Sequence, residues 1–67
     1  MNFNDWYNVF TNKVKGYSYN TCMRAMQDCY DTLKIQGDGI NPDYSNKLWA
    51  EIDALRNRQM TITRSRS

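Results

Sequence analysis

A chain of 67 residues with a net charge of +2 has the size of a single domain. No stretch approaches about 20 consecutive apolar residues, so we expect no transmembrane helix. Histidine is absent, which removes the usual acid–base catalyst at neutral pH, and two cysteines alone do not make a zinc site. We therefore predict a non-enzymatic protein without a cofactor, a metal, a small-molecule substrate or a membrane contact.

The first predicted helix covers residues 4–15. Its apolar residues recur at helical spacing, which places them on one face. They are Phe3, Tyr7, Phe10 and Val14, with Trp6 and Val9 at the border of the stripe. We expect Asn4 to cap this helix and Gly16 to end it in the left-handed conformation.

The second predicted helix lies between Ser18, a favourable N-cap, and Gly37, which ends it. Its apolar stripe consists of Cys22, Met26, Cys29 and Leu33. The residues that border the stripe are Tyr19, Met23 and Tyr30. Polar and charged side chains occupy the opposite face, so this segment is the clearest amphipathic helix of the chain.

The two cysteines, Cys22 and Cys29, lie seven positions apart on that stripe. In a helix this spacing separates them by roughly 10 Å, whereas a disulfide needs Cα atoms closer than about 7 Å. The N-terminal segment also lacks the basic and apolar regions of a secretory signal. We therefore expect two buried, reduced thiols and a cytoplasmic location.

The turn-rich stretch at residues 37–45 includes the turn signal Asn41-Pro42. Two starts of the third helix remain open. Either Pro42 opens a turn and Ser45 caps the helix, or Asn41 caps it and Pro42 is its first residue. We favour the second.

The third helix is predicted to run to about Met60. Its inner stripe consists of Tyr44, Leu48, Ile52 and Leu55, with Trp49 at the edge. Beyond Met60 come β-branched residues, which are weak in helices, and then a polar, basic RSRS sequence. We therefore expect residues 61–67 to form a frayed basic tail.

Three amphipathic helices with short connections predict an all-α fold. The expected arrangement is a small three-helix bundle or an open three-helix array with a short basic C-terminal tail. Residues 1–60 would form a single helical domain and residues 61–67 the tail. Because a chain this short without a disulfide or metal is often stabilised by a partner, we expect self-association or a protein partner.

The nine aromatic residues are more than a small core needs. Three short helices shelter only about five or six large rings. We assign three of the rings to the core, namely Trp6, Phe10 and Trp49. Four tyrosines at stripe edges or helix starts are predicted to be exposed and to bind a partner, namely Tyr7, Tyr19, Tyr30 and Tyr44.

Positive charge is concentrated at the C-terminal end. Residues 56–67 contain four arginines and no acidic residue, whereas residues 1–55 carry a net charge of −2. The arginines are Arg56, Arg58, Arg64 and Arg66. They form a solubilising tail, dock on an acidic protein surface, or contact nucleic-acid phosphates. A helix-turn-helix reader is disfavoured, because the connection near residues 37–43 exceeds the usual turn of about three or four residues.

The segment KLWAEIDALRNRQ is an ordinary amphipathic helix and carries no family motif. In size and style, the chain is similar to the tiny helical proteins common in bacteriophages and other mobile elements. That similarity implies an inhibitor of a host factor, an adaptor or a small virion component in the host cytoplasm. The predicted function is a helical protein-interaction module that binds a protein surface. The alternative is a nucleic-acid-associated protein that uses the arginine-bearing end.

Overall fold

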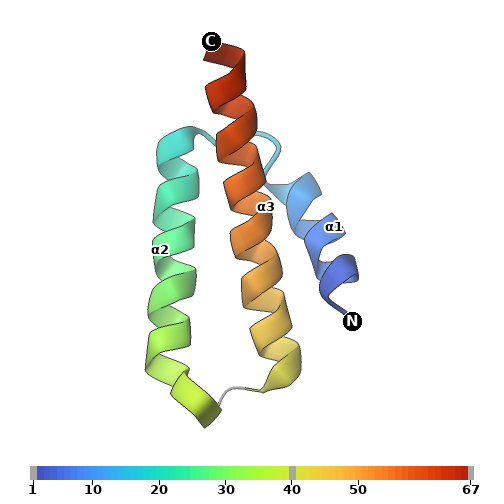
Figure 1. The fold of residues 1–67 in the computed structure, drawn as a ribbon, viewed down its shortest axis with the longest axis vertical. Helices are drawn as coiled ribbons and strands as arrows, with labels where there is room; N and C mark the ends of the chain where they lie inside the picture. Colours follow the sequence, from blue (N-terminus) through green and yellow to red (C-terminus); the bar gives the residue numbers. More distant parts are fainter. Residues whose placement is uncertain (1, 40, 67) are drawn as a thin grey trace.

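The computed structural model describes residues 2–39 and 41–66. Its elements in chain order are α1 (Phe3–Lys13), α2 (Tyr19–Gln36), a short 3-10 turn η1 (Gly37–Gly39) and α3 (Pro42–Arg66) (Figure 1). Within these residues every regular element is helical, which confirms the predicted all-α class of three helices.

The start of α1 is set by Asn2, whose side chain accepts a hydrogen bond of 2.9 Å from the backbone N–H of Asp5. The prediction that Asn4 caps this helix is wrong, because Asn2 reaches the free N–H group three residues on and leaves Asn4 inside the first turn. Gly16 does not end the helix in a left-handed conformation either. The last turn closes earlier, where the N–H of Val14 donates to the carbonyl of Phe10 at 2.9 Å.

Both predicted ends of α2 are confirmed. The hydroxyl of Ser18 accepts a hydrogen bond of 3.2 Å from the N–H of Thr21, as an N-cap does. At the other end Gly37 has a φ of 60°, which residues with a side chain rarely adopt, and its N–H donates to the carbonyl of Leu33. The glycine therefore turns the chain out of the helix.

The favoured start of α3 is also confirmed. The side-chain oxygen of Asn41 accepts a hydrogen bond of 2.8 Å from the N–H of Asp43, and Pro42 is the first helical residue. The backbone carbonyl of Asn41 accepts from the N–H of Ser45 at 2.9 Å, which is the first intrahelical bond.

The predicted end of α3 near Met60 is wrong, because the helix continues to Arg66. Three hydroxyl groups in this last part donate to the carbonyl four residues back, at 3.0–3.1 Å. They belong to Thr61, Thr63 and Ser65. Threonine keeps a helical rotamer when its hydroxyl finds this partner, so the β-branched residues do not end the helix.

The helices form an open array rather than a closed bundle. α1 and α2 each pack on α3 but do not approach each other, so α3 is the central element (Figure 1). The molecule is correspondingly flat, with extents of 41 × 22 × 15 Å. A helix with its side chains is about 10–12 Å wide, so the protein is little more than one layer of helices. Both broad faces of α3 are left without a covering helix.

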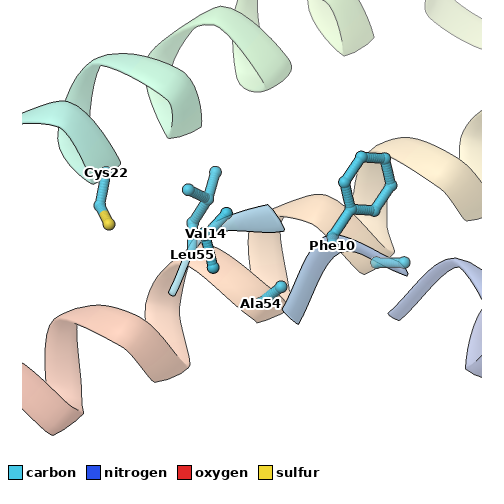
Figure 2. Close-up of a cluster of buried hydrophobic side chains, with 6 residues drawn as sticks. Phe10, Val14, Cys22, Ala54 and Leu55 are labelled. Carbon is cyan, nitrogen blue, oxygen red and sulfur yellow. The ribbon is translucent and has the colours of Figure 1, made fainter. Parts of the chain in front are cut away.

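The main core cluster is centred on α3 and combines side chains of α1 and its C-cap with one side chain of α2 (Figure 2). It consists of Phe10, Val14, Cys22, Ala50, Ala54 and Leu55. A second, smaller cluster between α2 and α3 consists of Cys29, Leu48 and Ile52. The predicted burial of Leu48, Ile52 and Leu55 is thus confirmed.

One aromatic assignment is wrong. Trp49 was expected in the core but is 46% exposed. Val9, at the border of the first stripe, is 47% exposed. Two alanines of α3, Ala50 and Ala54, are instead fully or almost fully buried. Small residues at this spacing let the neighbouring helix come close to α3, and both belong to the core cluster that contains Phe10 and Val14.

Candidate interaction face between α2 and α3

Large apolar side chains gather at one groove between α2 and α3, although each is substantially exposed. We call this surface the α2–α3 face and define it by Tyr19, Met23 and Tyr30 of α2 and Trp49 and Met60 of α3. These side chains are between 38% and 53% exposed. They account for most of the large apolar residues that the described part of the chain leaves in solvent, so the exposure is concentrated rather than scattered.

The two helices run antiparallel (Figure 1), and four of the five residues lie in two pairs at opposite ends of the face. At one end the rings of Tyr30 and Trp49 meet edge to face, with centroids 6.4 Å apart. At the other end Tyr19 and Met60 line the same hollow. Each helix covers eleven residues between the two ends, which corresponds to about 16 Å along the helix axis.

Two adjoining hollows cross this face. The first, of about 340 Å³, is lined by Tyr19, Arg56, Gln59, Met60, Thr63 and Arg64. The second, of about 300 Å³, is lined by Tyr19, Met23, Met26, Gln27, Tyr30 and Gln59. Tyr19 and Gln59 belong to both hollows, and the Gln59 side chain donates to the backbone carbonyl of Tyr19 at 3.5 Å. Both hollows are open to solvent, so they suit protruding side chains better than an enclosed small molecule.

Both basic and acidic side chains lie at the α2–α3 face, since Arg56 also lines a neighbouring hollow with Asp53, and Gln27 donates a hydrogen bond to Asp31. Arg56 and Arg64 line the first hollow, and of the described residues no aspartate or glutamate lines either hollow. Another hollow between the same helices, lined by Ala25, Asp28, Cys29, Thr32, Leu48 and Glu51, has two acidic residues and no basic one. The two sides of the α2–α3 pair thus differ in chemistry, and the large exposed apolar residues are on the side where Arg56 and Arg64 line a hollow.

Four of the predicted site residues meet at this face: Tyr19, Tyr30, Arg56 and Arg64. Tyr44 is 41% exposed, as predicted, but lies in the first turn of α3 and lines neither hollow.

The other predicted site residues have different surroundings. Tyr7 is only half-buried rather than exposed, because it packs against the core and its hydroxyl accepts a hydrogen bond from the Asn57 side chain. Arg58 is partly buried, and its Nε donates to the backbone carbonyl of Tyr17 at 3.0 Å. It therefore ties the connection between α1 and α2 to α3. The side chain of Arg66 lies outside the described part of the structure.

Sequence reasoning did not assign Met23, Trp49 or Met60 to a site. A signal existed for two of them. Met23 borders the apolar stripe of its helix and Trp49 borders that of the third helix. In two antiparallel helices that pack through their stripes, the border residues flank the same groove. The missing information was which border of one helix faces which border of the other.

Both thiols are free and buried, as predicted. Burial raises the pKa of Cys22, although the nearby Arg58 acts in the opposite direction. Burial raises the pKa of Cys29 to about 12, and the carboxylates of Glu51 and Asp28 add to this shift. A cysteine attacks only as its thiolate, so neither thiol has the ionisation that a nucleophile needs at neutral pH.

Within residues 2–39 and 41–66, no three histidine, cysteine, aspartate or glutamate side chains lie where they could hold a metal ion. In the same part of the chain, none of the helices combines the length and apolarity needed to cross a bilayer. Comparison of the chain with protein-family models, with curated proteins and with solved structures finds no match. The fold defines a small all-α protein of three helices.

Proposed function

We propose that this protein is a non-enzymatic interaction module that binds a protein partner through the α2–α3 face. The observation that carries this proposal is that four large, exposed apolar side chains line two adjoining hollows, with a fifth, Trp49, in edge-to-face contact with Tyr30. Tyrosine and tryptophan provide large, rigid contact areas with a polar tip and dominate the energetics of many interfaces. Methionine adapts to irregular partner surfaces. Such a module acts by occupying a surface, as an inhibitor, an adaptor or a small structural component does.

The geometry of the fold supports the same proposal. A single layer of helices leaves the groove between α2 and α3 uncovered, so a partner can bury apolar area that the protein cannot bury itself. Binding would also stabilise this short chain, because a ligand that binds only the folded state shifts the folding equilibrium. Arg58 is already engaged by the Tyr17 carbonyl, which favours protein binding over a function in which all the arginines contact phosphates.

The proposal is tested by affinity purification from native lysate, with and without nuclease, using the wild type and Met23→Lys. Met23 is 53% exposed, so the substitution should leave the fold intact. The matched control is Ile35→Lys on the same helix. Ile35 is 82% exposed and lies about 140° around the helix axis from Tyr30, away from the groove.

We expect a nuclease-resistant protein partner that the wild type and Ile35→Lys recover and that Met23→Lys loses. Equal recovery by Met23→Lys would show that the partner does not use this face. Recovery that disappears with nuclease would show bridging by nucleic acid and would support the alternative function. Circular dichroism of each variant should show unchanged helicity.

A further inference from the structure

A separate hollow lies between α1 and α3, beside the connection that leads from α1 to α2. Its lining includes Thr11, Val14, Lys15, Ala54 and Arg58. The volume is about 170 Å³, and the hollow is more enclosed than the two hollows of the α2–α3 face, with which it shares no lining residue. An apolar cavity of about 150 Å³ holds a molecule the size of benzene, so a ligand of about six non-hydrogen atoms fits here.

The charged groups of this hollow are basic. Its lining contains Lys15 and Arg58 and, of the described residues, no aspartate or glutamate. Arg58 is partly buried, and its Nε donates to the backbone carbonyl of Tyr17. This bond holds the guanidinium in place, while its terminal nitrogen atoms have no partner in the described part of the chain. A guanidinium withdrawn from water is usually paired with a carboxylate, so an anion from outside the chain would complete its surroundings.

Thr11 provides a second, independent observation. Its hydroxyl is buried and has no hydrogen-bond partner. Other helical threonines donate to the carbonyl four residues back, as Thr32, Thr61 and Thr63 do. Rotation about χ1 exchanges the hydroxyl of a threonine with its methyl group, so Thr11 can turn its hydroxyl toward an occupant without breaking a hydrogen bond. An acceptor in the hollow would recover the free energy that the unpartnered hydroxyl costs.

The apolar part of the lining specifies the rest of the ligand. The side chains of Val14 and Ala54 are buried and line the hollow. An inorganic anion such as phosphate would place oxygen atoms against these walls without hydrogen bonds, which is unfavourable. A carboxylate on a short aliphatic group places its two oxygens at the basic side chains, where a guanidinium binds both in parallel, and its carbon atoms against the apolar walls. We propose that this hollow binds a small aliphatic carboxylic acid in its ionised form.

The position of the hollow gives the bound acid a consequence for the fold. Thr11 belongs to α1, Lys15 to the connection and Arg58 to α3, so one ligand contacts all three segments. Because it binds only the folded arrangement, the acid stabilises the docking of α1 on α3. The site is distinct from the α2–α3 face, so its test is independent of the proposed function.

The test compares three probes at neutral pH and equal ionic strength: isobutyrate, its neutral isostere isobutyramide, and inorganic phosphate. Binding is followed by NMR of the Val14 and Ala54 methyl groups and of the Arg58 Nε–H group. We expect isobutyrate to shift all three signals with a millimolar dissociation constant, as suits a fragment of this size. Isobutyramide and phosphate should each bind about tenfold more weakly, since the first lacks the charge and the second lacks the apolar group.

Two variants keep the fold and remove one contact each. Lys15→Gln changes an exposed side chain, and Thr11→Val keeps the side-chain shape while it removes a hydroxyl that has no partner. Each should weaken isobutyrate binding about threefold. The matched control is Arg24→Gln, which removes one positive charge from an exposed position that does not line this hollow, and it should bind isobutyrate as the wild type does.

Four results would overturn the proposal. Equal affinities for isobutyrate and isobutyramide would show an apolar hollow without a carboxylate site. Phosphate that binds as tightly as isobutyrate would show that the apolar walls contribute nothing. A loss in Arg24→Gln as large as that in Lys15→Gln would attribute binding to net charge. If isobutyrate leaves the three signals unchanged, or if neither Lys15→Gln nor Thr11→Val weakens its binding, the acid does not occupy this hollow.

Discussion

Cys29 shows how a single residue gains its chemical character from its surroundings. Its side chain is 5% exposed and belongs to the small core cluster with Leu48 and Ile52. Two acidic residues, Glu51 and Asp28, lie near the thiol and oppose its ionisation, as burial does. The thiol therefore behaves as a small apolar group, and the same features make its ionisation a source of instability at high pH.

This pKa shift predicts a loss of stability at alkaline pH. The pKa of Cys29 is about 12 in the folded state, whereas an unperturbed thiol has a value near 9.0. The folded state thus holds the proton more tightly, so the stabilisation is complete below about pH 9 and is lost as the pH rises toward 12. Urea denaturation between pH 7 and 11 should show a steeper decline for the wild type than for Cys29→Ala. The two proteins differ only at position 29, so parallel curves would contradict the prediction.

The helix ends depend on short-range contacts, each within a few residues. Ser18 and Asn41 cap α2 and α3 through side-chain oxygens that accept from nearby backbone N–H groups. Gly37 ends α2 because its φ of 60° is accessible to glycine. Gly16, in the turn between α1 and α2, has no positive φ and no such requirement.

The two glycines therefore predict opposite effects of the same substitution. Gly37→Ala should destabilise the protein by about 1–2 kcal/mol, because alanine is strained at this backbone conformation. Gly16→Ala should stabilise it by about 0.4–1 kcal/mol, because the unfolded chain loses freedom while the folded chain gains no strain. An added methyl group meets no atom within 4 Å at either position, so packing does not confuse the comparison. Equal effects in chemical denaturation would contradict the backbone assignments.

The whole molecule is organised around α3. Because α1 packs on α3 and not on α2, its docking depends on the residues of α3 in the shared core cluster, which are Ala50, Ala54 and Leu55. Phe10 and Val14 are the residues of α1 in the shared cluster. The second cluster, between α2 and α3, involves no residue of α1. An open array of this kind should therefore lose one flanking helix without losing the other.

Ala54→Leu tests this property. A larger side chain at a position that is 2% exposed should push α1 away from α3 and cost about 1–3 kcal/mol. In hydrogen exchange, the amides of α1 should lose protection, whereas those of α2 near Cys29 should largely keep it. A uniform loss of protection in α1 and α2 would show that the three helices unfold as one closed bundle.

The face that carries the proposed function was accessible to sequence reasoning only in part. Tyr19 and Tyr30 were predicted to be exposed from their positions at the border of the stripe, and they are exposed. Arg56 and Arg64 were singled out because they belong to the arginine-rich C-terminal end. Trp49 was assigned to the core, because an aromatic residue at the edge of a stripe fits either environment. Its exposure depends on where α2 packs along α3. No local sequence pattern predicts that position.

The sequence by itself determined the helical class, the caps Ser18 and Asn41, the helix end at Gly37 and the buried stripe that contains Ile52. Each of these depends on residues within about one or two turns of one another, so local spacing is sufficient to predict them. The tertiary structure decided that α1 and α2 flank opposite sides of α3, that two alanines belong to the core, and that Tyr19 and Met60 line the same hollow. A stripe shows which side of a helix is buried but not which helix covers it. That pairing depends on contacts between residues distant in the chain, and these form the face to which we assign the function.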